Sequence, residues 1–146
     1  MKLDIKRVFP RDPAKFEGLR GIRLVTALFI VLVVVRSCIH LFASDGGAHS
    51  IAGVDTSVEG GENIIAMFHQ WGAIQLLLAL LLVVLFFRYP GLTPLILLSL
   101  AMDPVLRFVS GQIQHLTTVG TPPGETFNSA ALYLLLALFI ASLAKK

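Results

Sequence analysis

The sequence is short of charged residues and has a single cysteine. Asp, Glu, Lys and Arg make up 14% of its 146 residues, whereas a soluble domain carries about a quarter. Cys38 is the only cysteine, so no disulfide can form within the chain. These shortages argue against a separate soluble domain and exclude one stabilised by disulfides.

Catalytic and cofactor-binding motifs are also lacking. The sequence has no P-loop, no GxGxxG motif, no nucleophile elbow and no zinc-protease helix. The acidic residues Asp4, Asp12 and Glu17 interrupt the basic N-terminus, which argues against nucleic acid as a partner. We therefore expect no nucleic-acid partner and no cofactor, and the sequence favours a non-enzymatic function while leaving an enzyme open.

What the sequence does have is long apolar runs, and hydrophobic residues make up 55% of the chain. Four runs lie at about residues 21–43, 64–87, 92–109 and 127–144. A helix needs about 20 apolar residues to cross the hydrocarbon core of a bilayer. We predict an all-α fold, a four-transmembrane-helix up-down bundle, as a single integral membrane domain over residues 1–146 with a basic N-terminal arm over residues 1–20.

The charge distribution predicts the orientation of this bundle. Lys and Arg are frequent before and at the start of the first apolar run, where they are Lys2, Lys6, Arg7, Arg11, Lys15, Arg20 and Arg23. The loop at residues 44–63 has no Lys or Arg but four acids. Because Lys and Arg stay on the cytoplasmic side, we expect both termini in the cytoplasm and a location in a bacterial inner membrane.

Two further interpretations concern the N-terminal region. Residues 24–35 could be the core of a signal peptide, or residues 35–38 a lipoprotein cleavage box, but a long, partly acidic leading region and Arg36 argue against them. The arm either lies at the inner surface with Phe9, Phe16 and Leu19 dipping into the interface, or is a loosely ordered terminus.

Polar residues inside the apolar runs are the candidate site. Because such groups are costly in a membrane, they usually face a bundle interior or a cavity. With a rise of about 1.5 Å per residue, all of them fall in the outer half of the membrane, and Gln75 lies deeper, as a floor. We predict one shared cluster between the first three helices, opening outward. Its members are Arg36, His40, His69, Gln70, Asp103 and Arg107.

Three interpretations of this cluster remain open. In the first it is structural: Asp103 and Arg107, four residues apart, neutralise each other, Arg36 extends toward headgroups, and the histidines donate interhelical hydrogen bonds. In the second it binds a lipid- or quinone-like ligand. In the third His40, His69 and His115 hold a metal or haem, although no ligand spacing supports this, and we predict no metal site.

Three short segments resemble the DoxX-like group of small four-helix membrane proteins. They are residues 69–76 (HQWGAIQL), 88–91 (RYPG) and 103–107 (DPVLR). The resemblance extends by pattern over about residues 20–144. It implies a four-helix bundle, and some members of the group accompany membrane oxidoreductases. It implies no catalytic residue here.

The leading functional prediction is a small polytopic membrane protein that is non-enzymatic, either an accessory subunit or an oligomer. Ala137, Ala141 and Ala144 form a stripe on the fourth helix that would let a neighbouring helix approach closely. The alternative is a membrane protein that binds or acts on a lipid- or quinone-like ligand at the outer polar cluster. The expected partners are the lipid bilayer, other membrane subunits or a second copy, and a hydrophobic small molecule.

Overall fold

The protein is all-helical in the part that the structure, a computed structural model, describes, which is residues 3–119 and 123–144. The elements, in chain order, are η1 (Ile5–Val8), α1 (Arg20–Phe42), α2 (Gly61–Arg88), η2 (Pro90–Leu92), α3 (Thr93–Ile113) and α4 (Pro123–Ser142). The predicted all-α class is therefore confirmed, with four α-helices in the described residues. The boundaries differ most at α3, which ends four residues later than expected (113 against 109), and at α4, which begins four residues earlier (123 against 127).

Three helices are long and apolar enough to cross a membrane, which indicates an integral membrane protein. They are Arg20–Phe42, Gly61–Arg88 and Pro90–Ile113, the last of which combines η2 and α3. Within α4, the apolar helical stretch in the described residues is Phe127–Ser142, which is shorter than these three. The structure thus supports three candidate spans, and a bundle with four spans stays a prediction.

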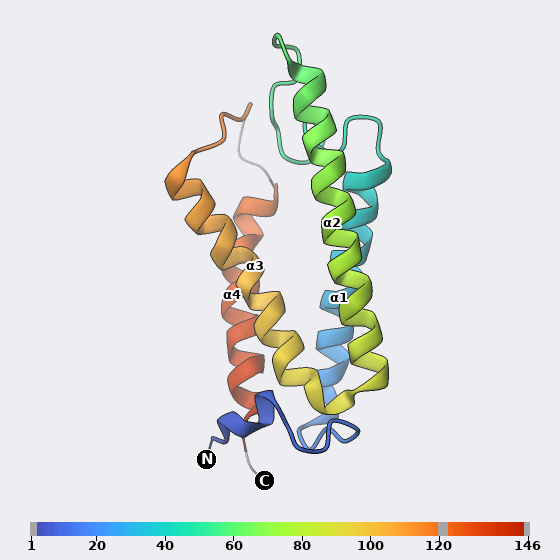
Figure 1. The fold of residues 1–146 in the computed structure, drawn as a ribbon. Helices are drawn as coiled ribbons and strands as arrows, with labels where there is room; N and C mark the ends of the chain where they lie inside the picture. The colour runs from blue at the N-terminus through green and yellow to red at the C-terminus, as the bar shows by residue number, and fades with distance from the viewer. Residues whose placement is uncertain (1–2, 120–122, 145–146) are drawn as a thin grey trace.

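The helices form two antiparallel hairpins, α1 with α2 and α3 with α4 (Figure 1). The short η2 turn joins them, and the hairpins lie close together there but diverge toward the opposite end, where α3 leans away from α2 (Figure 1). The two ends of the described chain also meet at the η2 side, because Leu3 and Ala144 form an isolated antiparallel bridge. We call this side the turn end, and the side that carries residues 43–60 the loop end.

The hydrophobic core fills the part of the molecule near the turn end. Its buried members come from all four helices and are Ile22, Ile30, Leu82, Phe86, Ile96, Leu97, Leu100, Ala101 and Leu135. Many other apolar side chains on the helices are exposed, among them Leu28 on α1, Leu77 on α2 and Phe108 on α3. Exposed apolar rows of this kind fit a surface that is solvated by lipid rather than by water.

The N-terminal arm, residues 3–19, packs against the turn end (Figure 1). Val8 is buried, and the Arg7 guanidinium donates to the Ala144 carbonyl at 2.5 Å. The Gly91 amide of η2 donates to the Pro13 carbonyl at 2.8 Å. The interpretation of a loosely ordered arm is therefore wrong for these residues. Phe16 is also not an interfacial anchor, because it packs partly buried against the core.

Residues 43–60 fold back over the loop end of α1 and α2. Gly46 and Gly47 have φ angles of 59° and 70°, which side chains rarely tolerate. Asp45 accepts hydrogen bonds from the amides of Gly47 at 2.9 Å and Ser50 at 2.8 Å, which fixes this turn. Ala48 is fully buried beneath it. The segment is thus a packed cap rather than a loose connection.

Candidate functional site

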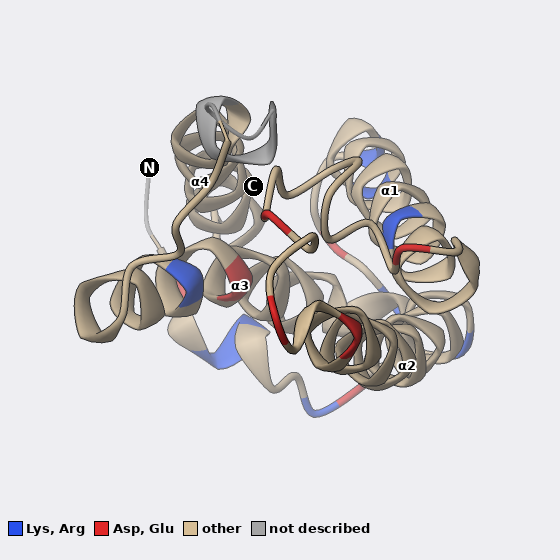
Figure 2. Ribbon diagram, turned by 90° about the horizontal axis from the view of Figure 1, so that it is seen from above, with Lys and Arg blue, Asp and Glu red and all other residues tan. Residues whose placement is uncertain are grey.

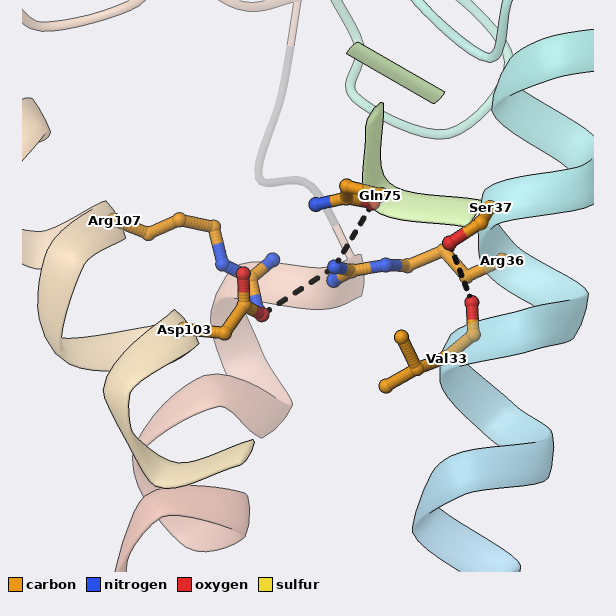
Figure 3. A network of polar contacts seen from close by, with 6 residues as sticks. All are labelled: Val33, Arg36, Ser37, Gln75, Asp103 and Arg107. Carbon is orange, nitrogen blue, oxygen red and sulfur yellow. Dashed lines mark hydrogen bonds and ion pairs between the residues drawn. The ribbon is translucent and has the colours of Figure 1, made fainter. Parts of the chain in front are cut away.

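An ion pair joins the two hairpins where they diverge. Arg36 on α1 reaches across to Asp103 on α3, with its Nη2 atom 3.3 Å from Asp103 Oδ2 (Figure 3). Arg36 lies in the loop-end half of α1, and Asp103 lies at the middle of α3. The Arg36 side chain is 22% exposed and that of Asp103 38% exposed. Arg36 therefore does not extend away from the protein toward headgroups, as the structural interpretation expected, but bridges the helices.

Arg107 completes the charged part of the site from the next turn of α3. Its Nη2 atom lies 2.7 Å from the same Asp103 Oδ2 atom that Arg36 contacts, and its side chain is 36% exposed. The predicted pairing of Asp103 and Arg107 four residues apart is confirmed. Two guanidiniums thus share one carboxylate oxygen, so the cluster carries one excess positive charge. The Nε atoms of Arg36 and Arg107 are both buried with no hydrogen-bond partner in the described protein.

Gln75 on α2 brings the third helix into the cluster, level with the charged side chains rather than beneath them as a floor (Figure 3). Its side-chain oxygen accepts from Arg36 Nη2 at 3.3 Å (Figure 3). In the opposite amide orientation the oxygen lies 3.1 Å from Arg36 Nη2 and 3.1 Å from Trp71 Nε1, so one atom then satisfies two donors. The Arg36 guanidinium carbon also lies 5.8 Å from the centroid of the Trp71 ring. The Arg36 side chain is therefore oriented by contacts from α2 as well as α3.

His40 and His69 form a separate, neighbouring group. His40 is 2% exposed, and its Nδ1 atom lies 2.8 Å from the Gly46 carbonyl. His69 Nδ1 lies 2.9 Å from the Leu41 carbonyl of α1. Because a carbonyl only accepts, both Nδ1 atoms must carry the proton. His40 also stacks obliquely on Trp71, with ring centroids 4.7 Å apart. The histidines thus fasten α1, α2 and the cap together.

The remaining polar candidates lie away from the charged group. Gln70 is exposed and makes no hydrogen bond to any described residue. His115 is exposed beyond the end of α3. In the described part of the chain, no three His, Cys, Asp or Glu side chains come together as a metal site. His40, His69 and His115 therefore do not converge as the metal interpretation required.

Two further residues lie in the site region. Trp71 contacts His40, lies beside Arg36 and meets Phe68 edge-on at 5.7 Å. The sequence signal for this position was the spacing, because Trp71 and Gln75 are four apart and share a helix face. Ser37 donates a hydrogen bond to the Val33 carbonyl at 2.7 Å and is buried, so it is part of the packing of α1 (Figure 3).

The arrangement can hold an anion or a polar oxygen but offers no obvious chemistry. Arg36 and Arg107 present donors and positive charge, and no nucleophile or histidine base contacts them among the described residues. The cluster opens partly to its surroundings, since its three charged side chains are about 20–40% exposed. Two hollows lie elsewhere: one beneath the N-terminal arm, and an apolar groove of about 470 Å³ along the loop-end half of α1, beside Cys38.

Comparison with known proteins gives no relative. No family model matches the chain, and no curated protein or solved structure matches it either. The resemblance to the DoxX-like group therefore stays a prediction that rests on the three short segments of the sequence.

Proposed function

We propose that this is a small, non-enzymatic integral membrane protein that binds the polar head of a lipid- or quinone-like molecule at the cluster of Arg36, Asp103 and Arg107. The observation that supports this proposal is the shared carboxylate oxygen. Two guanidiniums lie 3.3 and 2.7 Å from one Asp103 oxygen, so one positive charge has no counter-charge within the cluster. An anionic head would supply this counter-charge, whereas the carbonyl oxygens of a quinone would accept hydrogen bonds from the guanidiniums.

The energetic argument is that a charge in an apolar setting is costly unless it is paired. A purely structural bridge needs one arginine for one aspartate, and Arg36 with Asp103 already provides it. Arg107 adds a second charge together with a buried Nε–H that has no partner among the described residues. A ligand head group that accepts from Arg107 would offset both costs.

The surroundings suit a molecule with an apolar tail. Met102 and Leu106 flank the charged residues on α3, and both are exposed. The hairpins also diverge at this level, so the polar group lies at the edge of an apolar surface (Figure 1). A tail would then contact α3 while the head contacts the arginines.

The chain provides its own reporter for a test. Trp71 is the only tryptophan and lies beside Arg36. We would titrate the protein in phosphatidylcholine nanodiscs with oleate and with a decyl-substituted benzoquinone, and follow Trp71 fluorescence. Saturable binding is expected, weakened on the order of tenfold in Arg107→Gln, because one charge-assisted hydrogen bond is worth about 1.5–3 kcal/mol.

Arg88→Gln is the matched control, because Arg88 is an exposed arginine at the turn end, far from Trp71 in the chain's two-hairpin fold. It should bind both molecules like the unaltered protein. Equal affinities for the unaltered protein and Arg107→Gln would refute the proposed site, as would a fluorescence change that rises linearly without saturation.

A second candidate function is an accessory subunit or a homo-oligomer. It is favoured by Ala137, a small residue that α4 leaves exposed, while Ala141 one turn later is partly buried. A helix of a partner could approach α4 closely at Ala137. Light scattering of the detergent-solubilised protein measures this directly. A lone monomer from native membranes, without co-purifying subunits, would contradict it.

The proposed orientation places both termini in the cytoplasm of a bacterial inner membrane. In support, the basic arm lies at the turn end, whereas the acidic residues between α1 and α2 lie at the loop end, which faces the viewer in Figure 2. Labelling of a cysteine introduced at Ser50, in a Cys38→Ser background, tests this. A membrane-impermeant maleimide added to intact spheroplasts should label this cysteine. Absence of labelling would contradict the proposed orientation and favour the opposite one.

A further inference from the structure

A second candidate binding site lies at the opposite end of the molecule from the charged cluster. A partly open hollow of about 830 Å³ lies between the N-terminal arm and single residues of η2, α3 and α4. Pro94 of α3 and Ser142 of α4, both buried, form part of its wall, and Gly91 of η2 forms another part. The arm stays in place through the contacts from Arg7 to Ala144 and from Gly91 to Pro13. The hollow is thus built by tertiary structure.

The acids that line this hollow are already engaged. Glu17 pairs with Arg7 at 2.8 Å. Asp12 accepts from the Ala14 amide at 3.0 Å, and Asp4 accepts from the Lys6 amide at 3.1 Å, so both carboxylates hold local turns. Each of these contacts lies within the chain, and none of them neutralises a second cation of the lining.

Three cations of the lining are left without a counter-charge. They are Lys6, Arg11 and Lys15, all of which are exposed. Within residues 3–119 and 123–144, no acid forms an ion pair with any of them. All three line the same hollow, so their positive charges would attract an anion placed there.

The apolar residues of the same arm indicate what carries that anion. Ile5 is 68% exposed and Phe9 is 74% exposed. Both belong to the arm, which lies at the level where the candidate spans α1, α2 and α3 begin or end (Figure 1). This level is the depth of the headgroups if these helices cross a bilayer. Segments that combine exposed apolar residues with free Lys and Arg typically lie in the membrane interface.

We propose that the arm is an anionic-lipid site: Lys6, Arg11 and Lys15 bind the phosphate of an acidic phospholipid in the hollow, while Ile5 and Phe9 insert between the acyl chains. This site is separate from the Arg36 cluster and does not depend on a ligand there. A zwitterionic lipid carries the same phosphate, but its choline would meet the same three cations. The site therefore selects lipids with net negative charge.

The test compares two double variants that remove the same charge from the same end. Arg11→Gln with Lys15→Gln changes the hollow. Arg20→Gln with Arg88→Gln is the control, because both arginines are exposed near the turn end and neither lines the hollow. The full chain is purified in detergent, exposed to an equimolar mixture of phosphatidylglycerol and phosphatidylcholine, and the retained lipid is measured by native mass spectrometry.

We expect the unaltered protein and the control to prefer phosphatidylglycerol, and the hollow variant to lose this preference on the order of tenfold. Circular dichroism checks that all three proteins keep their helix content. Equal loss in both double variants would overturn the site in favour of diffuse surface charge, and so would no loss in either.

A further measurement tests whether free phosphate competes with the lipid. Inorganic phosphate is added at about 10 mM while the ionic strength is kept constant near its physiological value. Complete displacement of the lipid by phosphate would overturn the assignment to a lipid.

Discussion

The guanidinium of Arg23 lies over the ring of Phe86 and also hydrogen-bonds to the Phe86 carbonyl. The guanidinium carbon is 4.2 Å from the ring centroid, and Nη2 is 3.1 Å from the carbonyl oxygen. Through Nη1, Arg23 also donates to the Pro90 carbonyl at 3.2 Å and to Thr93 Oγ1 at 3.1 Å. One side chain of α1 thus binds the last turn of α2, η2 and the first residue of α3.

Replacing Arg23 should loosen the junction of the two hairpins. Arg23→Gln removes the cation above Phe86 and leaves carbonyls at the end of α2 without their donor. We expect a loss of about 2 kcal/mol in the free energy of unfolding. Unfolding by SDS, followed by circular dichroism in mixed micelles, measures it. Arg20→Gln, an exposed position one turn earlier, should leave stability nearly unchanged, and an equal loss there would contradict this role for Arg23.

Asp103 should be more important for stability than either arginine that it binds. Asp103→Asn leaves two guanidiniums facing each other without a counter-charge, whereas Arg107→Gln keeps the pair of Arg36 and Asp103. Because these side chains are partly exposed, we expect a cost of about 2 kcal/mol for Asp103→Asn rather than the larger value of a fully buried pair. Thermal unfolding in detergent should rank the two variants, and a lower midpoint for Arg107→Gln would contradict this order.

Gly72 lies where α2 packs directly against the backbone of α1. A Cβ atom at this position would lie 2.6 Å from the backbone carbon of His40 and 2.6 Å from the Leu41 nitrogen, so the helices must separate to admit it. Gly72→Ala should therefore destabilise the protein by about 2 kcal/mol, the usual cost of overpacking.

Gly111→Ala is the control for this substitution. Gly111 also lies within a helix, α3, but a Cβ atom there would meet nothing within 4 Å. Since alanine favours helix over glycine, we expect Gly111→Ala to be neutral or stabilising by up to about 1 kcal/mol. A similar loss in both variants of the pair would rule out the close approach as the cause.

Asp45 predicts a pH dependence in the cap at the loop end. The amide of Ser50 is the main hydrogen-bond donor that lowers the pKa of Asp45 from 3.8 to about 2, with Gly47 contributing as well. A lowered pKa means that the folded cap binds the proton less tightly than the unfolded chain does. The contribution of Asp45 to stability is therefore present above about pH 4 and is lost as the pH falls toward 2.

The carboxyl carbon of Asp45, followed by NMR in the full chain, should titrate with a midpoint of about 2. Asp45→Asn should abolish the loss of cap stability that the unaltered protein shows as the pH falls from about 4 to about 2, the interval between the unfolded and folded pKa values. Glu59→Gln, an exposed position in the same segment, serves as the control. A midpoint near the ordinary value of 3.8 would show that the two amide contacts do not persist.

The sequence predicted those features of the structure that depend on residue type and spacing alone. Lengths of apolar runs located all four helices, and helical rise together with four-residue spacing brought Arg36, Asp103 and Arg107 to one level, as the structure shows. The same reasoning included Gln70, which faces away, because depth along a helix does not fix the face. Gln75 and Trp71 share a face that Gln70, one residue before Trp71, cannot share.

Several of the contacts that the sequence did not reveal have backbone atoms as partners. His40 donates to the Gly46 carbonyl, His69 to the Leu41 carbonyl, and Arg23 to carbonyls at Phe86 and Pro90. Every residue carries a carbonyl, so no residue pattern marks which one a side chain will reach. For Gly46 and Pro90 the conformation of the cap and of η2 decides it, and these two segments have no periodic pattern in the sequence.

The contact between the arm and the end of α4 has a consequence for how the chain matures. The Asp4 amide donates to the Leu143 carbonyl at 3.0 Å, and Arg7 donates to Ala144. Synthesis runs from the amino end, so residue 4 leaves the ribosome long before residue 143 exists to receive it. The arm is therefore made before α4, and it can complete these two contacts only after the hairpin of α3 and α4 has formed.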